Sequence, residues 1–118
     1  MPTGMLLDAG EILRVMTDTC ICYMACVSEG MPYVLPLGFR LTGDGVLLHI
    51  RRSGKLYATL EASPQVCMAF SLIGGSHVDS VLAEGEARLC PTQDEPLAAV
   101  LVRIRSASGR RYPLSRMV

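Results

Sequence analysis

The chain has 118 residues, of which 50% are hydrophobic, and its 11 basic and 11 acidic side chains give a formal net charge of zero. This balance excludes a protein that attracts nucleic acid through its overall field, and no uncharged apolar run reaches the ~18 residues of a membrane span. One domain, residues 1–118, with one core is expected at this length. Since the mean hydropathy is +0.35, some apolar surface is expected to be buried against a second copy, which predicts a homodimer.

The start of the chain and its cysteines predict a cytoplasmic protein. The N-terminus has no basic segment and reaches Asp8 before any long apolar run, unlike a signal peptide. The five cysteines, an odd number, are typical of free thiols in a reducing compartment. Cys20, Cys22 and Cys26 lack the second pair of ligands that a zinc knuckle needs. With Met24 they would form an apolar stripe on one face of a strand.

The first half of the chain predicts one short helix followed by strands. Asp8 and Glu11 have the spacing of a capping box, and apolar side chains follow at helical intervals, so residues 9–17 are expected to form a helix. The next segment is apolar on both faces, which is typical of a buried strand. Turns with glycine separate it from two further β-prone segments. Strands are therefore expected at 19–28, 32–41 and 46–51.

The second half predicts a helix of about two turns that begins at Gly54 and stops at Ser63-Pro64. Two more strands are expected at 65–73 and 78–89, with a bulge or bend at Gly85.

The last segments predict a helix and a tail. Residues 92–95 have the pattern of a capping box, so residues 97–104 are expected to form a helix. Residues 106–118 are basic and poor in pattern, which predicts a flexible tail or a segment that packs on a partner subunit. About five strands joined by tight turns indicate a mainly β protein with short flanking helices, built as a small antiparallel barrel.

The corner after the third strand is the strongest candidate for a ligand site. Arg51, Arg52, Ser53 and Lys55 surround Gly54 where the helix begins. Cations, a hydroxyl group, a glycine and a helix N-terminus together favour a phosphate group. A solvated basic turn would contain the same residues.

The two histidines leave several interpretations open. His49 is either a half-buried strand histidine bonded to the backbone or a hydrogen-bond partner for a ligand. An acid–base role for it is less favoured, because no carboxylate accompanies it in the sequence. His77 and Asp79 are either a charge pair or part of a surface loop. No nucleophile elbow, phosphate-binding loop or dinucleotide fingerprint is present.

The order of these motifs resembles the flavin-binding split-barrel family related to pyridoxamine 5′-phosphate oxidase, in particular its nitroimidazole-resistance branch. The resemblance covers residues 8–105. It rests on Pro32-Tyr33-Val34-Leu35-Pro36-Leu37 with Phe39, on Leu48-His49, on Gly54-Lys55 with Leu60, on Pro64-x-Val66-Cys67, and on Ser80-Val81-x3-Gly85-x-Ala87.

This resemblance implies an antiparallel split β-barrel that holds FMN at a homodimer interface. It implies that backbone at Val34–Leu37 faces the flavin ring, and that Ser80 approaches the ring, from the partner subunit in one arrangement. The sequence departs from the branch at Leu56, which stands where a lysine is expected. The cofactor-binding residues implied are Val34, Leu35, Pro36, Leu37, His49, Ile50, Arg51, Arg52, Ser53, Lys55 and Ser80.

The function implied is that of an FMN-dependent oxidoreductase acting on a small molecule, in which the flavin carries hydride or electrons. Two alternatives stay open. One is a binding module, not an enzyme, that holds flavin or haem; the other is a diverged member whose cofactor site has decayed.

Overall fold

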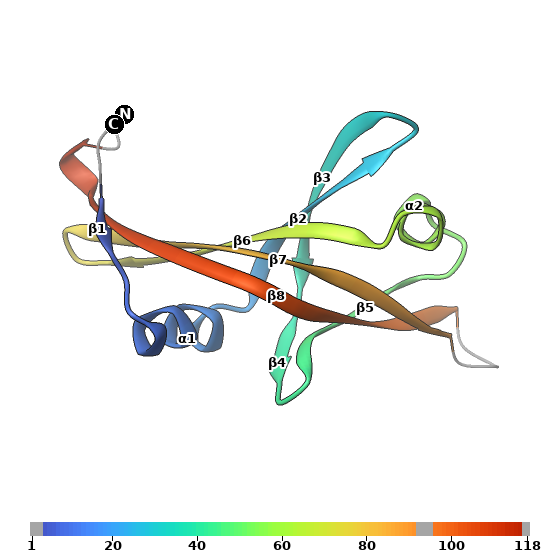
Figure 1. Ribbon diagram of the computed structural model, residues 1–118, viewed down its shortest axis with the longest axis horizontal. Coiled ribbons are helices and arrows are strands. Elements are labelled where there is room, and N and C mark those ends of the chain that lie inside the picture. The colour runs from blue at the N-terminus through green and yellow to red at the C-terminus, as the bar shows by residue number, and fades with distance from the viewer. Residues whose placement is uncertain (1–3, 92–95, 117–118) are drawn as a thin grey trace.

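The computed structural model describes residues 4–91 and 96–116, which fold into one antiparallel sheet with helices packed against it (Figure 1). The helices are α1 (Ala9–Asp18), α2 (Lys55–Ala62) and the 3-10 helix η1 (Leu114–Arg116). The strands are β1 (Met5–Leu6), β2 (Ile21–Ser28), β3 (Met31–Gly38), β4 (Arg40–Thr42), β5 (Gly45–Arg51), β6 (Gln65–Gly74), β7 (His77–Pro91) and β8 (Leu97–Pro113). Within the described ranges, no helix is long and apolar enough to cross a membrane.

The strands follow one another in the order β3-β2-β6-β7-β8-β5-β4, and β1 pairs with the far end of β8. Figure 1 shows the long strands β6, β7 and β8 running across the molecule, with the β2–β3 hairpin rising from them. β3 and β5 contact each other although no described ladder joins them. The sheet therefore curls into a barrel that stays open between β3 and β5, as a split barrel does.

The core lies inside this curl and follows the two-residue period of the strands. On β2 the side chains of Cys22, Met24 and Cys26 are buried, and they meet Met68 and Phe70 from β6. The apolar stripe expected on β2 is confirmed for these three residues, whereas Cys20 precedes the strand and is exposed. All five cysteines are free thiols.

The prediction that β2 is buried on both faces is wrong for the single chain. Ile21, Tyr23 and Val27 alternate with the core residues, and about half of each side chain remains exposed. Because this second face is apolar but uncovered, it offers a surface for another molecule.

The helices predicted at residues 9–17 and after Gly54 are both confirmed, as α1 and α2. The Asp8 carboxylate accepts a hydrogen bond from the Glu11 amide at 2.8 Å, and the Asp8 amide donates to the Glu11 side chain at 3.0 Å, which completes the capping box of α1. Helix α2 ends at Ala62, immediately before Ser63-Pro64. It packs against β2, β5 and β7, at the end of the barrel opposite β1.

The helix expected at residues 97–104 is wrong, because this segment is the first half of β8. Ala98, Val100 and Val102 are buried in alternation, and β8 pairs with β5 on one side and β7 on the other. The segment pairs with a strand on each side and buries every second side chain in the core, and these interactions override its helix propensity. The capping-box residues 92–95 lie outside the described residues.

The flexible tail expected at residues 106–118 is also wrong for most of its length, while packing of this segment on a partner subunit stays a prediction. Residues 106–113 continue β8 along β7, and residues 114–116 form η1. Residues 117–118 lie outside the described part. The continued pairing explains why this basic segment is ordered, since its backbone groups complete the ladder of β7.

The bulge expected at Gly85 is confirmed. The register between β7 and β8 shifts between Glu84 and Gly85. A Cβ atom at Gly85 would lie 2.3 Å from the carbonyl oxygen of Arg103, so only glycine fits where the strands approach this closely.

Candidate functional site

The basic corner predicted from the sequence lies between the end of β5 and the start of α2. The side chains of Arg51 and Ser53 are exposed there, and Gly54 is the N-cap of α2. Among the described residues, no side chain caps the amide groups of the first helical turn, so these N–H groups are donors for an anion. The backbone is fixed by the Arg52 amide, which donates to the Pro96 carbonyl oxygen at 2.9 Å.

Lys55 connects this corner to β3. Its Nζ atom lies 4.4 Å from the centroid of the Tyr33 ring, a cation–π contact between the first residue of α2 and β3 close to the β2–β3 turn. Lys55 is the only lysine of the chain. The next residue, Leu56, is buried in the core, so the position where the resemblance implies a lysine cannot supply a charge.

The predicted ring-binding residues of β3 lie on two faces of the strand. Val34 and Pro36 are exposed on the outer face, while Leu35 and Leu37 are half-buried against the core. One flat ligand cannot contact all four side chains. The backbone of β3 remains available along its open edge, because β2 is its only described ladder partner.

The predicted residues of β5 are divided in the same way. His49 and Arg51 share the exposed face, and neither side chain forms a hydrogen bond or an ion pair with another described residue. Ile50 points the opposite way and is 6% exposed, so only its backbone could contact a cofactor. His49 is thus exposed rather than half-buried.

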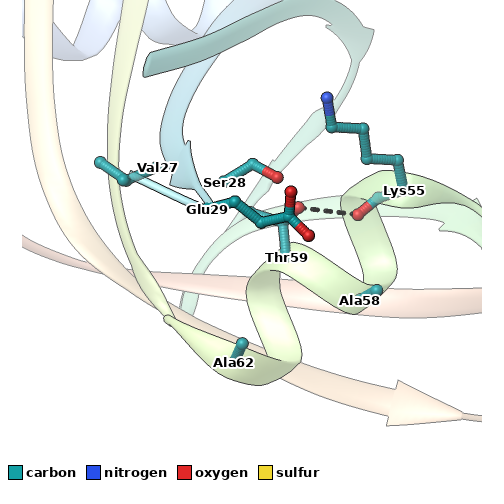
Figure 2. Close-up of a pocket in the computed structure, with 7 residues that line it drawn as sticks. All are labelled: Val27, Ser28, Glu29, Lys55, Ala58, Thr59 and Ala62. Carbon is teal, nitrogen blue, oxygen red and sulfur yellow. Dashed lines mark hydrogen bonds between the residues drawn. The ribbon is translucent and has the colours of Figure 1, made fainter. Parts of the chain in front are cut away.

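A groove of about 350 Å³ lies between the β2–β3 turn and α2. Figure 2 shows the Glu29 side chain reaching toward the helix, and the Thr59 hydroxyl donating to the Lys55 carbonyl oxygen at 2.8 Å. The groove is lined by Val27, Ser28, Glu29, Lys55, Ala58, Thr59 and Ala62. Because Glu29 brings a carboxylate into it, this groove suits a phosphate less well than the exposed corner at Arg51, Ser53 and the first turn of α2.

Ser80 is the one predicted residue that the structure does not bring to this region. It lies on β7, opposite Ser71 of β6 and Arg110 of β8, and lines a separate groove with Leu82 and Tyr112. β2 and β6 stand between β7 and β3 in the sheet. Within one chain, Ser80 therefore cannot meet a ligand bound along β3.

A buried ion-pair cluster lies at the other end of the barrel, and the sequence did not reveal it. The Asp79 side chain is fully buried and accepts hydrogen bonds from Arg111 Nε at 2.7 Å and Nη2 at 2.9 Å. Arg14 of α1 donates to the same carboxylate at 3.2 Å. The hydrogen bond from Arg111 lowers the pKa of Asp79, and the same contact raises the pKa of Arg111.

This cluster corrects the expectation for His77 and Asp79. They belong to strand β7 and not to a surface loop, and His77 Nε2 lies 3.9 Å from the Asp79 carboxylate. The charge pair is therefore present, but the arginines are the principal partners. Since both carboxylate oxygens of Asp79 accept hydrogen bonds from arginines, the cluster joins α1, β7 and β8. Arg111, the missed partner, lies within the segment predicted as a tail.

The buried thiols are poor nucleophiles. Burial raises the pKa of the Cys22 thiol to about 11. Burial also raises the pKa of Cys26, an effect that the charge of Lys55 partly offsets. Both side chains therefore stay protonated near neutral pH and serve packing.

The chain belongs to the pyridoxamine 5′-phosphate oxidase family, whose sequence model matches residues 8–116. This match confirms the resemblance drawn from the motifs of the sequence. No curated protein matches the chain in a sequence comparison.

Solved structures confirm the split-barrel fold. A FAD-binding protein from Mesorhizobium loti is 22% identical with a TM-score of 0.83, covering 91% of this chain and 96% of its own. A 5-nitroimidazole antibiotic resistance-like protein from Bacteroides thetaiotaomicron is 18% identical with a TM-score of 0.82, covering 92% of this chain and 87% of its own. The flavocytochrome Anf3 from Azotobacter vinelandii is 21% identical with a TM-score of 0.76, covering 89% of this chain and 67% of its own.

Proposed function

We propose that this protein is a cytoplasmic, homodimeric flavoprotein that binds FMN and acts as an oxidoreductase on a small molecule. The observation that carries the proposal is the meeting of three elements at one point. The open edge of β3, the exposed end of β5 and the uncapped N-terminus of α2 come together, and the Lys55–Tyr33 contact holds α2 against β3.

The residues at this corner fit the phosphate of FMN. Arg51 and Lys55 supply positive charge, Ser53 supplies a hydroxyl group, and the first turn of α2 supplies amide donors. Neither Arg51 nor Lys55 forms an ion pair with a carboxylate in the described part of the chain. These charges are therefore available to an anion, and a charge-assisted hydrogen bond is the strongest kind they could make.

The flavin ring would lie along β3, on the hairpin side of the same corner. FMN supplies a ring that accepts and returns hydride or electrons, so the chain itself needs only to bind, orient and desolvate it. The site fits this division of labour, because His49 has no carboxylate partner among the described residues and Asp79 is fully engaged elsewhere.

The exposed outer face of the sheet supports the homodimer. Pro36, Tyr23, Ala69 and Leu82 lie opposite one another across β3, β2, β6 and β7, and they form one apolar row. Tyr23 is 51% exposed and Leu82 is 52% exposed in the single chain. A second copy on this face would bury the row, and it would bring a β7 with Ser80 toward the β3 of its partner.

The test uses the single lysine as a reporter. Acetylation of the full-length protein should label Lys55, and bound FMN should protect this lysine from the reagent. The α-amino group is the internal control, because it should react equally with and without FMN. Mass spectrometry of the digested protein measures both sites.

Affinities of Lys55→Ala for FMN and riboflavin complete the test. The variant should bind FMN about tenfold more weakly, since one charge-assisted contact is lost, with riboflavin binding unchanged. Equal losses for the two ligands would place the phosphate elsewhere. A colourless purified protein that binds no added FMN would overturn the proposal as a whole.

A further inference from the structure

A second groove, of about 390 Å³, lies where β3 passes into β4 and faces β5. It is lined by Gly38, Phe39, Arg40, Leu47, Leu48 and His49. Its volume is that of a small-molecule site. It adjoins Leu37, the last of the β3 residues assigned to the flavin ring, so a molecule bound in the groove would lie next to that ring.

The groove carries two nitrogen groups and no carboxylate. Arg40 pairs across the hairpin with Leu47, and His49 is two residues farther along the same exposed face of β5. Such diagonal neighbours have Cα atoms about 7–8 Å apart, so the guanidinium and the imidazole can reach one group between them. The Arg40 side chain forms no hydrogen bond or ion pair with any described residue.

The rest of the groove is apolar and fixed. The Phe39 ring packs edge-on against Phe70 of the core, with 5.1 Å between ring centroids and an angle of 76° between the rings. Leu47 is half-buried on the wall beside it. An apolar wall with an arginine at its rim suits a molecule that has an apolar body and one planar anionic group, because guanidinium binds carboxylate through two parallel hydrogen bonds.

The surrounding face strengthens the preference for an anion. Arg51 is the next residue after His49 on the exposed face of β5. Arg88 lies on the same face of the sheet but on β7, and Leu101 of β8 separates it from Leu47. Arg51 thus adds positive charge beside the groove, which raises the local concentration of anions, whereas Arg88 lies two strands away from Leu47.

We infer that this groove is a substrate subsite in which Arg40 and His49 hold the carboxylate of a small organic acid against Phe39 and Leu47. The role as a substrate site rests on the proposed flavin function, but the binding itself does not. The protein would then act on an organic acid with a short apolar or aromatic body.

The experiment titrates full-length protein, with and without FMN, using benzoate as the probe. Benzamide, which has the same ring without the charge, and inorganic phosphate are titrated in parallel. Binding is measured by calorimetry and by the NMR shifts of the His49 imidazole. Benzoate should bind and shift His49, and benzamide and phosphate should bind much more weakly.

Arg40→Gln should weaken benzoate binding about tenfold or more, with a smaller loss for Arg40→Lys. Arg88→Gln is the matched control, since it removes a cation from the same face but not from the groove, and should change binding less than twofold. Benzoate affinity that is unchanged in Arg40→Gln, or equally reduced in Arg88→Gln, would overturn the inference. Tighter binding of phosphate than of benzoate would overturn the carboxylate assignment.

Flavin content separates this inference from the proposed function. Arg40→Gln should retain FMN, and its loss would instead assign Arg40 to the cofactor site and overturn the inference. If no variant binds FMN but benzoate binding still depends on Arg40, the subsite stands while the flavin function fails.

Discussion

Among single residues, Asp79 offers the clearest link between charge and stability. Its carboxylate is fully buried and bonded to Arg111 and Arg14. Asp79→Asn should lower the free energy of unfolding by about 2 kcal/mol, because the three charge-assisted hydrogen bonds from Arg111 and Arg14 are weakened or lost in a buried place. Urea denaturation measures this change. Asp44→Asn, in the exposed β4–β5 turn, is the control and should leave stability unchanged; a similar loss in both variants would contradict the role of the buried pair.

The same residue should make stability depend on pH in the acid range. The hydrogen bond from Arg111 lowers the folded-state pKa of Asp79, so the unfolded chain binds a proton more readily than the folded one. The contribution is complete above the ordinary aspartate pKa of about 3.9 and is lost as the pH falls through the lower folded value. The urea midpoint of unfolding, measured from neutral to acid pH, should fall less steeply with pH in Asp79→Asn than in the wild type. Parallel pH profiles would contradict the prediction.

At the basic corner between β5 and α2, the proximity of Arg51, Ser53 and Lys55 could be predicted because they are neighbours in the chain. It could not show the contact of Lys55 with Tyr33, since that depends on how the β2–β3 hairpin bends over α2. Arg40, the residue proposed for the substrate subsite, was not predicted from the sequence, because one arginine in a strand is typical of a solvated face. Only the groove beside His49 distinguishes it.

At the scale of elements, β2, β3, β5, β6 and β7 were predicted from apolar segments and turn residues, whereas β1 and β8 were not. The single strand expected at 32–41 is two strands, β3 and β4, which meet at Phe39. Residues 97–104 combine alanine, leucine and valine, and in isolation they suit either a helix or a strand. The choice is made by β5 and β7, which lie on both sides of this segment and offer unpaired backbone groups. Such long-range pairing has no local signal.

The bulge at Gly85 is the element most sensitive to a small change. Gly85→Ala would put a methyl group against the Arg103 carbonyl oxygen and Val102 Cγ1, so β7 and β8 would have to move apart. The free energy of unfolding should fall by about 2 kcal/mol, as is typical of overpacking. Thermal and urea denaturation measure it. Gly43→Ala is the matched control, because a Cβ there has nothing within 4 Å. Equal stability of the two variants would show that the strands adapt without cost.

For the whole molecule, the outer face of the sheet explains why so oily a sequence leaves large side chains uncovered. Its apolar row runs from Pro36 through Tyr23 and Ala69 to Leu82. The same face contains Val34, of which 64% is exposed. The row and the predicted ring-binding strand are thus one surface, so dimer formation and flavin binding should depend on each other.

Leu82→Arg tests this dependence. An arginine within the proposed interface would bury an unpaired charge, so the variant should be monomeric at micromolar concentration where the wild type is dimeric. Light scattering after size exclusion measures the mass. Because Ser80 and β3 would no longer meet across the interface, the variant should also lose bound FMN.

Leu13→Arg, at an exposed leucine of α1, is the control and should remain a dimer. A monomeric wild type would contradict the interface, and a monomeric variant that retains FMN would place the whole flavin site within one chain.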